Sequence, residues 1–146
     1  MRKKVEQKQY SGDPGLASLL ETISAGNALP EVTGLHGASR ALMLSLLFRR
    51  LNRSILAVTP SEGDAEQLFR DVTFFLDSPD VLLHAPWDLR LLSSDDILSI
   101  QQETVQSRIR VLTRLLSGGP LVVVTSVEAL LQRVMPLGDL VDYLET

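Results

Sequence analysis

The sequence predicts an α/β fold, with a parallel sheet of about four strands and helices on both faces. Two observations favour this class. Short aliphatic runs alternate with amphipathic helical segments along the chain. The runs ILAVT (Ile55–Thr59) and LVVVT (Leu121–Thr125) are apolar throughout, which is typical of strands that are buried on both faces. Parallel strands need long crossovers, so the intervening helices are expected to cover both sides of the sheet.

The first third of the chain predicts a tail, a helix, a strand and a second helix. Residues 1–12 are basic and are expected to be a flexible tail, and the folded domain is expected to span residues 13–135. Asp13-Pro14 is a typical helix start, and Gly26-Asn27 a typical helix end. Pro30–Thr33 is predicted to be a short strand. The helix that follows, from about Ala38 to Leu51, is apolar on most of its circumference and is expected to be buried on more than one side.

The remaining elements follow the same alternation. Ser61 is predicted to cap a helix that ends at a turn over Asp77–Asp80. Residues 85–96 are expected to form a loop, and residues 136–146 to begin a connection to a further module. The other expected elements are the strand Val81–His84, the helix Ile97–Leu116, the helix Ser126–Met135 and a helix over Asp139–Thr146.

Composition narrows the possible functions. The chain has 146 residues, which predicts one domain, and its net charge of −4 without a basic stripe does not favour general binding of nucleic acid. Cysteine is absent, which excludes disulfides, thiol catalysis and thiolate metal sites and is typical of the cytoplasm, the expected location. Two distant histidines do not favour a metal site, and no apolar run is long enough to predict a membrane span.

The central motif is the glycine turn at residues 34–41, GLHGASRA, between an expected strand and an apolar helix. This layout is that of a phosphate-binding loop, for which the pattern is G-x-x-x-x-G-K-[ST]. Gly34 matches the pattern and Gly37 is an additional inner glycine, but Ser39, Arg40 and Ala41 replace the last three positions. Ser39 adds a Cβ where the backbone must approach a phosphate closely. Arg40 has a wide, planar guanidinium in place of the compact ammonium of lysine, and Ala41 has no hydroxyl to bind Mg²⁺.

We therefore interpret these five residues as a vestigial phosphate loop that is kept for packing. No catalytic residue, metal ligand or cofactor is expected in this chain. Weak binding of a nucleotide or another anion at the helix N-terminus remains an alternative.

Other chemically active side chains have ordinary structural explanations. His36 is expected to face solvent, and His84 to be partly buried with one hydrogen bond. Trp87 is either a packing residue at the end of the sheet or an anchor for a partner. Asp95-Asp96 are expected to cap the long helix, and Ser39 and Ser126 lack the context of a nucleophile elbow.

Two groups of arginines are candidate contacts for DNA. Arg108, Arg110 and Arg114 lie along one predicted helix, where a solvated face is the expected role. The residues Arg49, Arg50 and Arg53 lie at the end of another helix, where cations meet the helix dipole. DNA binding is expected to be weak or absent.

The motifs in their order resemble the N-terminal, UvrB-like domain of the bacterial transcription-repair coupling factor (Mfd). The segments that carry the resemblance are Val32–Leu47 with the glycine turn, Ile55–Leu76, the APWD loop at Ala85–Asp88, and Arg108–Pro136. One departure is Leu89–Leu92, where many members have Leu-Pro-Tyr. The resemblance implies a phosphate-loop (RecA-like) fold, similar to the first domain of UvrB, of which this chain is an incomplete part.

The resemblance also implies a role. The parent protein uses ATP and Mg²⁺ in a distant motor to remove stalled RNA polymerase from DNA, and it recruits UvrA for excision repair. This chain would be a non-catalytic scaffold that contacts neighbouring domains of the parent. An incomplete domain is expected to expose apolar surface and to self-associate. The alternatives are a nucleotide-binding NTPase module with an atypical loop, and a DNA-binding module.

Overall fold

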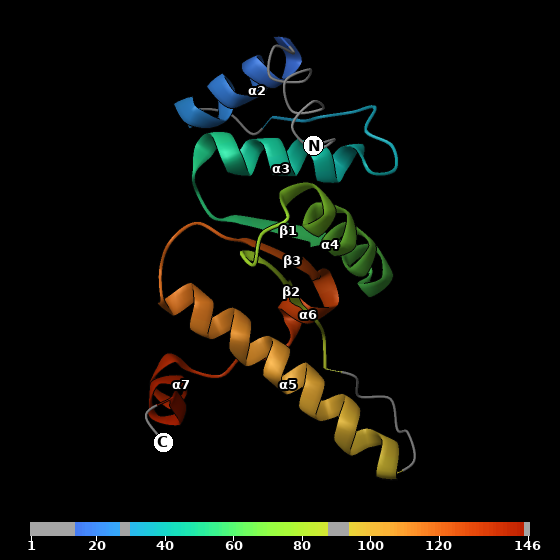
Figure 1. Cartoon of the computed structure of the whole chain (residues 1–146), viewed down its shortest axis with the longest axis vertical. Helices are drawn as coiled ribbons and strands as arrows, with labels where there is room; N and C mark the ends of the chain where they lie inside the picture. Colours follow the sequence, from blue (N-terminus) through green and yellow to red (C-terminus); the bar gives the residue numbers. More distant parts are fainter. Residues whose placement is uncertain (1–13, 27–29, 88–93, 145–146) are drawn as a thin grey trace.

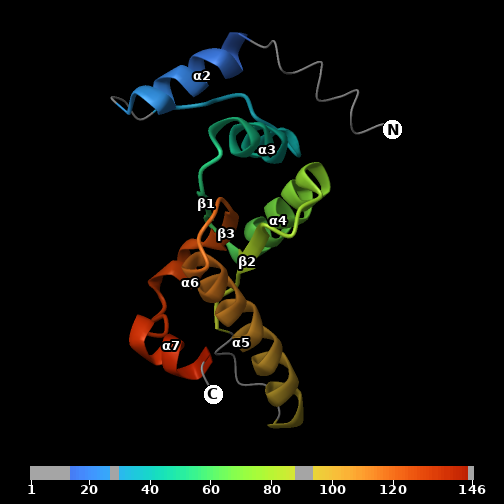
Figure 2. The same ribbon diagram turned by 60° about the vertical axis from the view of Figure 1, so that its left-hand side comes forward.

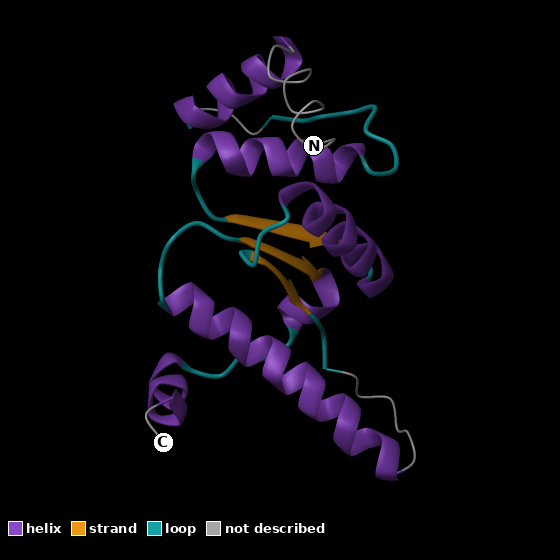
Figure 3. Cartoon of the chain, viewed as in Figure 1, coloured by secondary structure: helices purple, strands orange, loops and turns teal. Residues whose placement is uncertain are grey.

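The computed structural model describes residues 14–26, 30–87 and 94–144. Within them, the sheet has three strands, β1 (Ile55–Thr59), β2 (Val81–His84) and β3 (Val122–Ser126). All pairs are parallel, and β3 lies between β1 and β2 (Figure 3). The predicted α/β class with a parallel sheet is confirmed. The expected tail at residues 1–12 and the N-cap Asp13 lie outside the described residues.

Helices connect and surround the strands (Figure 1). The chain folds α2, α3, β1, α4, β2, α5, β3, α6 and α7 in this order. The helices are α2 (Pro14–Ala25), α3 (Ser39–Leu51), α4 (Glu62–Leu76), α5 (Ser94–Leu116), α6 (Val127–Leu131) and α7 (Leu137–Leu144).

The sheet has a hydrophobic core on each face, because successive strand residues point to opposite sides. On one face, α4 and α3 pack against the sheet. That core comprises Ala41, Ala57, Ala65, Val72, Leu76, Val81, Val122 and Val124. On the other face, Val111 of α5 packs with Leu82, Leu121 and Val123. The continuously apolar strand β3 therefore has the two-sided burial that its sequence predicts.

Strand β1 is covered on only one face, so the prediction that it is buried on both faces is wrong for this strand. Ala57 is buried in the core, whereas the neighbouring side chains Leu56 and Val58 are 58% and 46% exposed. The expectation that the chain exposes apolar surface is confirmed for this strand. Self-association through such a surface remains a prediction.

The predicted helix ends are confirmed where the sequence carries a specific signal. The Ser61 hydroxyl accepts a hydrogen bond from the Asp64 backbone N–H at 3.2 Å, and it donates to the Asp64 carboxylate at 2.6 Å. Asn52 ends α3 in the left-handed conformation, with a φ angle of 49°. Gly26 follows α2 with a φ angle of 67°. Glycine and asparagine tolerate a positive φ better than most residues, and a serine hydroxyl can accept from a free N–H group at a helix start.

The predicted strand Pro30–Thr33 is wrong for this structure. The segment is irregular and exposed, and it does not join the sheet. In both Figure 1 and Figure 2, α3 lies between this segment and the strands. The segment therefore has no strand beside it to bond with, and Pro30 has no backbone N–H to donate.

Other boundaries also differ from the expectation. The last helix, α7, begins at Leu137 rather than at Asp139, and β3 is shifted by one residue. The helix α5 begins at Ser94, so residues 94–96 belong to the helix rather than to the preceding loop. The helix α6 ends at Leu131 and not at Met135, because Gln132 is extended, with φ and ψ angles of −83° and 148°. This extended backbone accompanies contacts between the Gln132 side chain and the loop after β2, described below.

Candidate functional site

The glycine turn has the backbone of a tight loop but uses its polar groups internally. Gly34 and Gly37 have φ angles of 78° and 54°, which favour glycine. The Ser39 hydroxyl and the Ser39 N–H both donate to the carbonyl of His36, at 2.7 Å and 3.2 Å. Ala41 is completely buried in the core. In this conformation the Ser39 hydroxyl and N–H are therefore committed to the loop itself, and Ala41 serves packing.

The position of the turn differs from that of a working phosphate loop. Such a loop connects a strand of the sheet to a helix, so that phosphates lie beyond the carboxyl end of that strand. Here residues 30–36 pass along the side of α3 that faces away from the strands (Figure 2). The turn thus lacks the strand that would place it over the sheet.

Arg40, the cation of the turn, lines the same hollow as two aspartates. A hollow of about 300 Å³ contains Arg40 together with Asp64 and Asp71 of α4, and its other lining residues are Gly37, Ala38, Gln67 and Leu68. The Asp64 carboxylate accepts from Ser61, and the Asp71 carboxylate accepts from Gln67 Nε2 at 3.0 Å. Two carboxylates in the same hollow oppose the approach of a polyphosphate.

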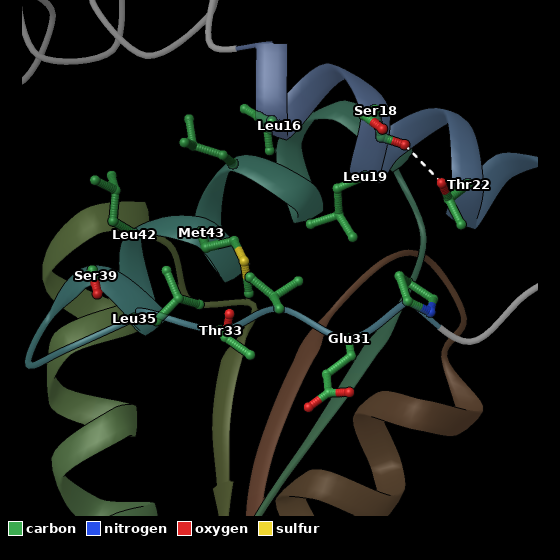
Figure 4. A pocket seen from close by; sticks show the side chains of 14 residues that line it. Leu16, Ser18, Leu19, Thr22, Glu31, Thr33, Leu35, Ser39, Leu42 and Met43 are labelled. Carbon is green, nitrogen blue, oxygen red and sulfur yellow. Dashed lines mark hydrogen bonds between the residues drawn. The ribbon is translucent and has the colours of Figure 1, made fainter.

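A larger cavity of about 510 Å³ lies between α2, α3 and the segment 30–35 (Figure 4). Its walls are mostly apolar and include Leu16, Leu19, Val32, Leu35, Leu42, Met43 and Leu46. The Thr22 hydroxyl at its edge donates to the Ser18 carbonyl at 2.8 Å, and the Glu31 carboxylate points away from the helices. The helix α2 has an apolar stripe in its sequence, yet none of its residues is buried in the structure. This stripe was the feature of the sequence from which the cavity could have been predicted. Among the described residues that line the cavity, the hydroxyls of Thr22 and Ser39 donate to backbone carbonyls and not to a side-chain base.

The carboxyl end of the sheet carries buried polar side chains. Thr125 donates its hydroxyl to the carbonyl of His84 at 2.9 Å, and His84 Nδ1 lies 3.3 Å from the same hydroxyl oxygen. Thr59 donates to the carbonyls of Ser61 and Thr125. The Ser126 hydroxyl accepts from the Ala129 N–H at 3.2 Å and so caps α6. These contacts bind strands and helix ends together rather than activating a nucleophile.

The environment of His84 disfavours its protonated form, the imidazolium. Burial and, to a smaller extent, the charge of Arg108 lower the pKa of His84 from its ordinary value of 6.5. Its folded-state pKa therefore lies below its unfolded-state pKa. Between these two values the unfolded chain binds more protons than the folded chain, so folding weakens as the pH falls.

We expect the free energy of unfolding to fall as the pH is lowered through 6.5. In the His84→Gln variant, which cannot take up this proton, the decrease between pH 7.5 and pH 5 should be smaller. Urea titrations at both pH values measure the difference. His36 is exposed, so His36→Gln is the matched control and should keep the pH dependence of the original chain. An equal dependence in all three chains would contradict the assignment.

Arg108 is not on a solvated face, contrary to the expectation. It is only 4% exposed, and its two terminal nitrogens donate to the carbonyls of Ala85 at 2.8 Å and Arg133 at 3.1 Å. Its guanidinium carbon lies 5.0 Å from the centre of the Trp87 ring, within the range of a cation–π contact. Burial lowers the pKa of Arg108. Trp87 is half-buried at the end of the sheet, which agrees with its predicted role as a packing residue there.

Two further arginines from the predicted groups bond to other parts of the chain. Arg114 pairs with the carboxylate of Asp80 at 2.7 Å, and this bond, with one from Ser78, lowers the pKa of Asp80. Arg49 and Arg50 lie in the last turn of α3, as predicted. Arg49 also donates to the carbonyls of Phe75 and Leu76 at the end of α4. Arg50, Arg53 and Arg110 are exposed.

The predicted helix cap Asp95-Asp96 can be placed on the backbone only. Asp95 and Asp96 lie in the first turn of α5 rather than before it. Their side chains lie outside the described part of the structure, as does Asp88.

Among the residues that the structure describes, no group of three or more His, Cys, Asp or Glu side chains could hold a metal ion. None of the described helices is both long and apolar enough to cross a membrane.

Comparison of the chain with models of protein families, with curated proteins and with solved structures found no match. The fold class and the geometry of the turn are therefore the observations on which a function can be argued.

Proposed function

We propose that this chain is a non-catalytic scaffold domain of a bacterial transcription-repair coupling factor. The observation that supports the proposal is the position of the glycine turn and the residues around it. It keeps two glycines with positive φ, yet it lies away from the sheet, and its one cation shares a hollow with Asp64 and Asp71. A turn of this kind supports packing of α3 and not phosphoryl transfer.

The resemblance of the ordered motifs supports the choice of family. In this proposal the ATP and Mg²⁺ belong to a motor elsewhere in the parent protein, which works on DNA in the cytoplasm. The scaffold contacts neighbouring domains of the parent, and UvrA and RNA polymerase are partners of the parent as a whole. Its finer fold is that of the first domain of UvrB.

The alternative of an NTPase module has less support. Catalysis of phosphoryl transfer depends on positioned cations and Mg²⁺ around the phosphates. The hollow beside Arg40 instead contains two carboxylates, and Ala41 is buried without a hydroxyl. The DNA-binding alternative is also weakened, because Arg49, Arg108 and Arg114 already bond to carbonyls or a carboxylate of this chain.

The gene itself tests the family assignment. Sequencing of the reading frame downstream of the codon for Thr146 should reveal an ATP-dependent motor with helicase motifs. A frame that closes there, or one that continues into an unrelated domain, would contradict the proposal.

A further inference from the structure

Two loops meet at the carboxyl end of the sheet through one amide side chain. The first loop, Ala85–Trp87, follows β2, and the second, Gln132–Arg133, follows α6. The Trp87 N–H donates to Gln132 Oε1 at 2.6 Å, and Gln132 Nε2 donates to the Trp87 carbonyl at 3.3 Å. Because both bonds reach the main chain of the same residue, the amide takes the place of a neighbouring strand.

Arg108 joins the same two loops from α5. One of its terminal nitrogens bonds to the Ala85 carbonyl and the other to the Arg133 carbonyl. Its guanidinium also lies over the Trp87 ring at 5.0 Å. We call Trp87, Arg108 and Gln132, with the carbonyls they bind, the clasp. It contains four hydrogen bonds and one cation–π contact between residues 21 to 45 positions apart in the chain.

The last residues of the clasp, Gln132 and Arg133, come shortly before α7 in the chain. This helix has eight residues, and helices of that length are not stable alone in water. Its buried side chain Leu140, which is 2% exposed, shows that α7 is docked on other parts of the molecule. Only residues 134–136 separate the clasp from α7, so the clasp limits where α7 can lie.

The clasp is separate from the two hydrophobic cores of the sheet. Neither core, as far as the structure describes it, includes Trp87, Arg108 or Gln132. Loss of the contacts made by Gln132 would therefore leave the packing of the strands in place.

We propose that the clasp is a conformational latch. When it is closed it holds the chain after α6 against the loop after β2 and so docks α7; when it opens, α7 is released while the sheet stays folded. This proposal does not depend on the proposed function.

Hydrogen–deuterium exchange of the whole chain, read by mass spectrometry, tests the latch. The Gln132→Leu variant loses both bonds to Trp87, and its α7 amides should exchange about tenfold faster, since each lost bond weakens docking. In the unsubstituted chain the α7 amides should exchange faster than those of β1 and β3, because α7 is released without unfolding of the sheet. Gln132→Glu keeps an acceptor for the Trp87 N–H and should give a smaller increase. Gln106→Leu, at an exposed position of α5, is the matched control and should change neither region.

Two results would overturn the proposal. Unchanged exchange of α7 in Gln132→Leu would mean that the clasp does not dock this helix. Equal protection of α7 and of the strands in the unsubstituted chain would mean that α7 is released only when the sheet unfolds, so that the clasp is no separate latch.

Discussion

The Arg108→Met variant is expected to lose about 2 kcal/mol of the free energy of unfolding. Methionine keeps much of the apolar stem of arginine but removes the donors to the carbonyls of Ala85 and Arg133. Hydrogen bonds to a charged group stabilise by about 1.5–3 kcal/mol each, and relief of the buried charge offsets part of this loss. The cation–π contact with Trp87 is lost as well.

Urea unfolding followed by circular dichroism measures this loss. The fluorescence of Trp87, the only tryptophan of the chain, should change in the folded state of the variant, because the guanidinium no longer lies over the ring. Arg110→Met removes the same charge from an exposed position of the same helix and should change the free energy of unfolding by less than about 0.5 kcal/mol. Equal effects of the two substitutions would contradict the buried role of Arg108.

The Leu121→Ala variant is expected to lose about 3 kcal/mol of the free energy of unfolding. Leu121 is 1% exposed and packs with Leu82, Val111 and Val123 between the sheet and α5. Truncation removes transfer free energy and leaves a cavity in the smaller of the two cores. That core has few other side chains that could move to fill the space.

The matched control for Leu121→Ala is Leu116→Ala. Leu116 is at the end of α5 and is 47% exposed, so its truncation should cost less than about 0.5 kcal/mol. Chemical denaturation of both variants compares them directly. A small loss in Leu121→Ala would mean that α5 does not cover the second face of the sheet as described.

The strands of the sheet could be predicted because their sequences carry the pattern of double burial. Ile55–Thr59 and Val81–His84 have the predicted bounds, and β3 is shifted by one residue. The segment Pro30–Thr33 has a similar local pattern but no strand beside it. A local pattern cannot supply a pairing partner, which is a property of the whole fold.

The polar contacts at the end of the sheet could be predicted only in part. Arg108 precedes the buried Val111 by three residues, so the two lie on the same side of α5, and this spacing was the available signal for its burial. Its carbonyl partners lie 23 and 25 residues away, and no periodicity indicates them. The three departures of the glycine turn from the phosphate-loop pattern, by contrast, could be read from its residues one by one.

Isothermal titration of the chain with ATP in the presence of Mg²⁺ tests the central claim, that residues 34–41 no longer hold a triphosphate. The expected result is no saturable heat at nucleotide concentrations up to about 1 mM. Saturable binding that requires Mg²⁺ and is lost in the Arg40→Ala variant would contradict the claim.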